Sequence, residues 1–121
     1  MKQMTIFDFI MDAEKEEPEF SEATKKIRDI FSVQHRIPRD TLRLYMSAAF
    51  KEDISDRKMR AMLENAKNEG FVIGNNQDGQ GYYVPETLKE LEIIYRQNEN
   101  RALSILRQQK HIKRKMMELR E

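Results

Sequence analysis

The chain has 121 residues, of which 36% are charged, a net charge of +1 and no cysteine. Its length fits one domain with an appended element. The lack of cysteine excludes disulfides and thiolate chemistry. No apolar run approaches the roughly 20 residues of a membrane-spanning helix. We expect a soluble, mostly helical, cytoplasmic protein that does not contact membranes.

Charge is strongly segregated along the chain. Residues 1–24 carry two basic and seven acidic side chains, and residues 25–73 carry eleven basic and seven acidic ones. Residues 74–95 carry one basic and four acidic side chains, and residues 96–121 carry eight basic and three acidic ones. The cationic middle and end suit contact with phosphate backbones.

The N-terminus joins an apolar cluster to an acidic stretch that contains Pro18. The cluster lacks the basic flank of a secretory signal, and the acidic stretch has no periodicity. We interpret residues 1–20 as a flexible peptide and linker. The alternative is that Ile6, Phe7 and Ile10 form a short helix packed on the domain.

Three helices are predicted between residues 21 and 70. Ser21 can cap the first, Pro38 suits the first turn of the second ("IPRDTLRLYMSAAF"), and Ser55 or Asp56 can cap the third. Gly70 is a natural left-handed stop for the third helix. The apolar positions at helical spacing are Ile27, Ile30 and Phe31, then Leu42, Tyr45, Met46, Ala49 and Phe50, then Met59, Met62, Leu63 and Ala66.

A β-hairpin follows in "FVIGNNQDGQGYYV", where residues 71–73 and 82–84 are β-formers around a Gly- and Asn-rich tip. Three helices and a hairpin are the order of a winged helix-turn-helix, whose third helix reads the major groove. We therefore predict a mainly α fold with a small β-hairpin, as a winged-helix domain over residues 21–86.

DNA contact is predicted for the third helix and the hairpin tip. The candidates on the helix are Arg57, Lys58, Arg60, Asn65, Lys67 and Asn68, and those on the wing are Asn75, Asn76 and Gln77. A solvated helix face and ordinary turn chemistry are the alternatives.

One long, coiled-coil-like helix is predicted over residues 87–121, because apolar residues there alternate by three and four. Two polar residues, Asn98 and Gln109, lie in this seam and would fix its register. We expect a homodimer, and the alternative is a helix folded back on the domain. The predicted seam consists of Leu91, Tyr95, Asn98, Ala102, Ile105, Gln109, Ile112 and Met116.

Catalysis and metal binding have no candidates in the sequence. His35 and His111 lie far apart and have no carboxylate at ligand spacing, and no serine has a glycine elbow or a plausible base nearby. We predict a protein that is not an enzyme and has no cofactor.

Three short motifs lie within residues 54–107. They are Asp56-Arg57 at the start of the third helix, Gly81-Tyr82-Tyr83 on the return strand, and Arg101-Ala102 with Ile105-Leu106 in the last helix. With these motifs the stretch resembles a family of small phage and prophage winged-helix proteins. The resemblance implies a winged helix and a role in phage DNA replication or regulation.

The stretch Gln3-Met4-Thr5-Ile6-Phe7 resembles the pentapeptide by which bacterial proteins bind the sliding clamp. The resemblance implies that Gln3 hydrogen-bonds at the rim of a pocket on the clamp. Met4, Ile6 and Phe7 would fill its apolar subsites, so that a few anchors carry most of the binding energy.

Three functions agree with these patterns. The first is a phage-type DNA replication accessory protein that binds DNA by its winged helix and the host sliding clamp by its N-terminal peptide. The second is a dimeric winged-helix transcriptional regulator. The third is an inhibitor or interaction module that does not contact DNA.

Overall fold

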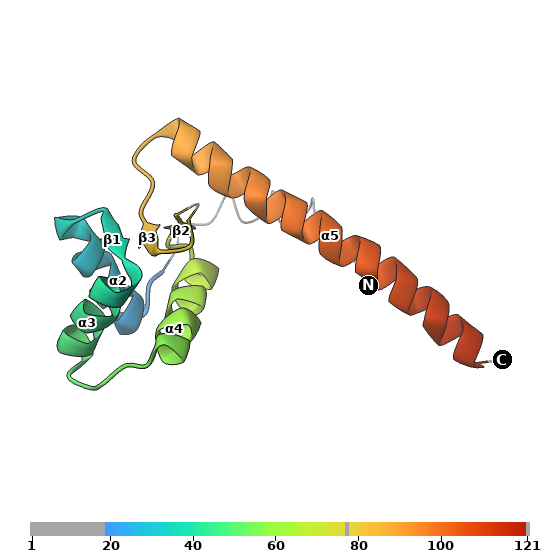
Figure 1. Cartoon of the computed structure of the whole chain (residues 1–121), viewed down its shortest axis with the longest axis horizontal. Coiled ribbons are helices and arrows are strands. Elements are labelled where there is room, and N and C mark those ends of the chain that lie inside the picture. The colour runs from blue at the N-terminus through green and yellow to red at the C-terminus, as the bar shows by residue number, and fades with distance from the viewer. Residues whose placement is uncertain (1–18, 77, 121) are drawn as a thin grey trace. The chain divides into compact units, whose positions relative to one another are not determined.

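The computed structural model of the chain describes residues 19–76 and 78–120 (Figure 1). The chain divides into two compact units, Met1–Val84 and Pro85–Glu121. Some residues singled out in the sequence lie outside the described residues: Gln3, Met4, Ile6 and Phe7 of the N-terminal peptide, and Gln77 of the hairpin.

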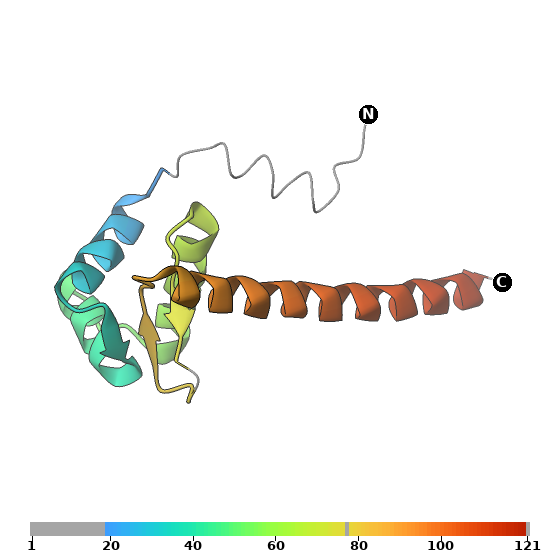
Figure 2. The same cartoon turned by 90° about the horizontal axis from the view of Figure 1, so that it is seen from above.

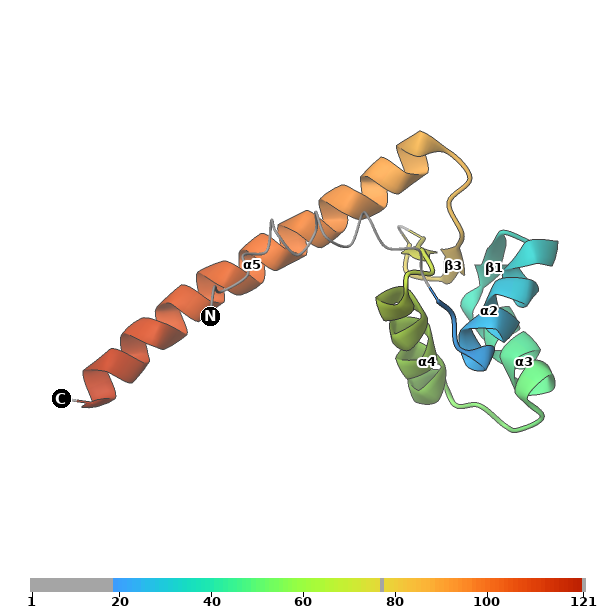
Figure 3. The ribbon, with the colours of Figure 1, turned by 180° about the vertical axis from the view of Figure 1, so that it is seen from behind.

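Three helices of the first unit, α2 (Glu22–Val33), α3 (Arg39–Phe50) and α4 (Asp56–Glu69), pack together (Figure 3). The Ser21 hydroxyl caps α2 by accepting a hydrogen bond from the Thr24 N–H at 3.3 Å. The Ser55 hydroxyl does the same for α4 with the Lys58 N–H at 3.1 Å. Gly70 ends α4 with a φ of 110°, so the predicted caps and stop are confirmed.

A small antiparallel sheet completes the first unit. Its strands are β1 (Arg36–Pro38), β2 (Gly74–Asn75) and β3 (Gly81–Tyr83), in the spatial order β1-β3-β2. The hairpin of β2 and β3 is the yellow and gold segment in Figure 2. The elements therefore follow one another as helix, strand, helix, helix, strand, strand.

Two predictions about the strands were wrong. The helix expected from Ile37 starts at Arg39, and Ile37 lies in β1 instead. Pro38 explains this, because a proline disfavours helical geometry in the residue before it. The hairpin's first strand begins at Gly74, not at Phe71, because the Phe71 N–H donates to the Ala66 carbonyl at 3.0 Å in the turn that ends α4.

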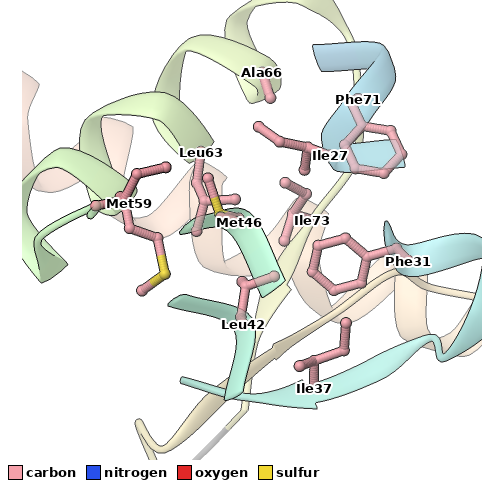
Figure 4. Close-up of a cluster of buried hydrophobic side chains, with 11 residues drawn as sticks. Ile27, Phe31, Ile37, Leu42, Met46, Met59, Leu63, Ala66, Phe71 and Ile73 are labelled. Carbon is pink, nitrogen blue, oxygen red and sulfur yellow. The ribbon is translucent and has the colours of Figure 1, made fainter. Parts of the chain in front are cut away.

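The core of the first unit lies between the three helices and one face of the sheet. Figure 4 shows its side chains, and truncating one of them, as in Leu42→Ala, typically costs about 2–5 kcal/mol. Tyr45, at helical spacing with Leu42 and Met46, is 45% exposed, because it lies at the edge of the stripe that these two residues form on α3. The core residues are Ile27, Phe31, Ile37, Leu42, Met46, Ile54, Met59, Leu63, Ala66, Phe71 and Ile73.

The second unit is the long helix α5 (Leu88–Arg120), which contains no glycine or proline and runs without a break (Figure 2). The Thr87 hydroxyl accepts a hydrogen bond from the Glu90 N–H at 3.1 Å and caps its start. No helix in the described ranges combines the length and apolar character needed to cross a membrane.

Candidate nucleic-acid interface

The outer side of α4 carries three of the predicted DNA-binding residues. Met59, Leu63 and Ala66 of α4 are buried. At 3.6 residues per turn, Arg57, Asn65 and Asn68 lie on the opposite side, and all three are exposed. Between them on this side are Ala61 and Glu64.

The remaining candidates on α4 lie toward the edges of this side and are engaged by acids. Lys58 forms an ion pair with Glu52 in the turn before α4, and Arg60 forms one with Asp56. The half-buried Lys67 lies 3.7 Å from Glu64. Such solvent-exposed pairs contribute about 0–1 kcal/mol each, so a phosphate group can compete for these cations.

Arg57 differs from the other cations of α4. Within residues 19–76 and 78–120 it forms no ion pair or side-chain hydrogen bond. It also lies in the first turn, where helix N–H groups add positive potential. Arg57 is therefore the cation on this helix that can meet an anion without first giving up an acidic neighbour.

The start of α4 is linked to the hairpin through Arg39, a residue that the sequence reading missed. The Arg39 N–H donates to the Gln80 carbonyl at 2.8 Å, and its side chain lies 3.9 Å from the Asp56 carboxylate. Tyr82 of β3 lies near this group: burial raises its pKa, and the Asp56 charge adds to the rise. Arg39 thus contacts both the hairpin and the start of α4.

The hairpin tip is shaped by its own hydrogen bonds. The Gly79 N–H donates to the Asn76 carbonyl and the Gln80 N–H donates to the Asp78 carboxylate, both at 2.9 Å. Gly79 has a φ of +70°, which suits glycine. Of the predicted wing residues, Asn75 is exposed, whereas the Asn76 side chain already accepts a hydrogen bond from Arg36 at 2.7 Å.

Arg36 of β1, also missed in the sequence, places a positive charge at the base of the hairpin. Its guanidinium lies 4.5 Å from the centre of the Tyr83 ring, a cation–π distance. The Tyr83 ring lies so close to Gly74 that a Cβ there would come within 2.4 Å of it. Register explains the stack, because Arg36 and Gly74 both pair with Tyr83 and cross-strand partners point to the same face.

The predicted seam of α5 faces solvent within the single chain. Tyr95, Ile105, Ile112 and Met116 are between 51% and 58% exposed, and Leu91 is 42% exposed. Asn98 and Gln109 are exposed as well, and Ala102 is half-buried. Ile94, which is buried, lies beside the seam and not in it. An apolar stripe of this length on one helix is a surface suited to a protein partner.

In the part of the chain that the structure describes, no three His, Asp or Glu side chains are grouped so that they could hold a metal ion. Every buried polar side-chain atom there has a hydrogen-bond partner. The polar residues near α4 and the hairpin are therefore either committed to the fold or exposed at the surface.

No protein-family model, curated protein or solved structure matches the chain. What its surfaces bind must be inferred from their own side chains.

Proposed function

We propose that residues 21–86 form a winged helix that binds duplex DNA, with α4 in the major groove and the β2–β3 hairpin as the wing. The order of elements and the β1-β3-β2 sheet support this proposal. The observation that carries it is the outer side of α4, where Arg57, Asn65 and Asn68 face away from the core. A major groove about 12 Å wide admits such a helix.

Each side chain has a role in this proposal. Arg57 contacts a phosphate or the O6 and N7 of a guanine, and the amide of Asn65 or Asn68 pairs with an adenine. Ala61 lets the helix backbone approach the bases closely. Lys58 and Arg60 exchange their acidic neighbours for phosphates, which positions the helix without reading sequence.

Titration of a labelled random-sequence duplex tests the proposal. Arg57→Ala/Arg60→Ala should weaken binding by roughly tenfold and reduce the magnitude of the negative slope of log K against log salt by about 1–2, because one or two phosphate contacts are lost. Arg28→Ala is the matched control, since Arg28 is an exposed arginine on α2. Unchanged affinity in the double variant contradicts the proposal.

We further propose that the protein self-associates through α5 and acts as a phage-type replication accessory protein that also binds the bacterial sliding clamp. The exposed seam of α5 supports the first part. The second part depends on the resemblances of residues 54–107 and Gln3–Phe7. Gln3→Ala/Phe7→Ala should abolish capture of the protein by immobilised clamp, whereas Met11→Ala should not. Equal capture of both variants leaves a dimeric regulator as the better proposal.

An interaction module that never contacts DNA is a second candidate. The ion pairs of Lys58 with Glu52 and of Arg60 with Asp56 favour it, because they offset cations next to the outer side of α4. The same titration separates the two candidates: no salt-dependent binding of the wild-type protein to duplex would select the interaction module.

A further inference from the structure

The two polar residues of the α5 seam are placed symmetrically within it, which heptad spacing alone does not require. The seam's residues lie in pairs about the point midway between positions 103 and 104, and Asn98 and Gln109 form one of these pairs. If the centre of pairing moved half a heptad along the helix, to position 100 or 107, each polar residue would be paired with an apolar one. The other pairs of the seam are Ala102 with Ile105, Tyr95 with Ile112 and Leu91 with Met116, and Leu88 and Leu119 continue the pattern beyond it.

These pairs match the layers of two helices that run in opposite directions. In the heptad abcdefg, Tyr95 and Gln109 take a positions, whereas Asn98 and Ile112 take d positions. Antiparallel helices pack a against d, so Asn98 meets Gln109 and Tyr95 meets Ile112. The two polar residues then satisfy each other while the apolar ones are buried. A parallel pair would also match polar with polar, so direction has to be decided by charge.

Charge differs between the two ends of α5. In the antiparallel register residues 107–120, which carry six basic side chains and one acidic one, face residues 87–100, which carry three acidic side chains and two basic ones. Parallel pairing would place the two basic ends beside each other. Antiparallel pairing places each basic end beside an acidic start, and opposite charges flanking a seam stabilise it.

Individual charged residues that flank the seam also favour the antiparallel direction. Glu92 and Lys113 both occupy e positions, which face each other between antiparallel helices, so the pair forms twice in a dimer. In a parallel dimer g faces e, and Lys115 would meet Arg120 of the second copy twice. Glu92 and Lys113 form no ion pair in the described part of the chain, so both are free to pair between copies.

We propose that α5 binds α5 of a second copy in the antiparallel direction, centred between Ala102 and Ile105 with Asn98 opposite Gln109. This inference rests on the self-association proposed above and adds its direction and register. The starts of the two α5 helices then lie at opposite ends of the pair. Each helix spans about 50 Å at 1.5 Å per residue.

Cysteine cross-linking in the full chain tests the direction, because the chain has no cysteine of its own. We expect Leu91→Cys mixed with Met116→Cys to form a disulfide-linked dimer of the two variants. Each variant alone should not cross-link, because antiparallel pairing separates its two thiols by roughly 37 Å. Cross-linking of Leu91→Cys with itself would overturn the direction while leaving self-association intact.

A charge exchange gives an independent test that leaves the seam unchanged. Glu92→Lys should weaken the dimer about fivefold or more in sedimentation equilibrium, and adding Lys113→Glu should restore it. Lys89→Glu, away from the seam, is the control and should have a smaller effect. A Glu92→Lys variant that dimerises like the wild type overturns the register. A wild-type protein that sediments as a monomer overturns both pairing and self-association, and the DNA titration still decides the function of α4.

Discussion

The carboxylate of Glu69, at the end of α4, accepts two hydrogen bonds from Ser21, the cap of α2. The Ser21 N–H donates to Oε1 at 2.6 Å and the hydroxyl donates to Oε2 at 3.0 Å. The same hydroxyl accepts a bond from the Thr24 N–H. One carboxylate therefore joins the start of α2 to the end of α4, and these bonds lower the pKa of Glu69.

Glu69→Gln should reduce stability at neutral pH and have little effect in acid. The pKa of Glu69 in the folded protein lies below its ordinary value of 4.5. Its contribution is therefore present above pH 4.5 and is lost as the pH falls through the folded value. Urea unfolding midpoints of wild type and variant should differ at pH 7 and converge as the pH falls below 4.5 through the folded pKa. Glu19→Gln is the control, and a difference that persists unchanged in acid contradicts the link.

Lys51→Gly should stabilise the protein by up to about 1 kcal/mol. Lys51 ends α3 with a φ of 56° and a ψ of 39°, a left-handed conformation that is unfavourable for a residue with a Cβ. Urea unfolding measures the change. Lys51→Ala removes the charge but keeps the Cβ, so it should not stabilise, and equal gains in both variants would point to charge as the cause.

Gly74→Ala should destabilise the first unit by about 1–3 kcal/mol, because the new methyl group overlaps the Tyr83 ring. The ring is only 5% exposed, with Arg36 stacked against it, and has little room to move. Asn75→Ala, at the next and exposed position of β2, is the matched control for urea unfolding. If Gly74→Ala were as stable as the wild type, the Tyr83 ring would be able to move away from the new methyl group without loss of stability.

The helices could be predicted from the sequence because their signals are local. Ser21, Ser55 and Gly70 act within one helical turn, and apolar periodicity locates each buried stripe. Strand β1 could not, because three residues carry no periodic signal. Pro38 keeps Ile37 out of the helix, but the pairing of Ile37 with Tyr82 of β3 joins residues far apart in the chain, which local sequence does not reveal.

The candidate site was predictable only in part, for the same reason. The outer side of α4 follows from helical spacing, which places Arg57, Asn65 and Asn68 together. Spacing does not reveal that Asp56 lies between Arg39 and Arg60, or that Arg36 reaches Asn76. These contacts depend on how α3 and the sheet pack against α4, and they decide which cations are already engaged by an acid.

Asp56→Asn should strengthen DNA binding, because Asp56 holds both Arg39 and Arg60 beside the outer side of α4. Removing its charge frees two guanidinium groups for phosphates. We expect a gain in affinity of about 3- to 10-fold at low salt, which shrinks as added salt screens the charges. Fluorescence anisotropy with a random-sequence duplex at two salt concentrations measures both effects.

Asp29→Asn provides the control for this change, because Asp29 is an exposed acid that lies near Arg28 on α2. Asp29→Asn changes the net charge by the same amount as Asp56→Asn, but at a position in α2 and not in α4. An equal gain in both variants would assign the effect to net charge. A gain for Asp56→Asn alone, together with a loss for Arg57→Ala/Arg60→Ala, would locate the DNA contact at the start of α4, because both changes act on the same cations with opposite sign.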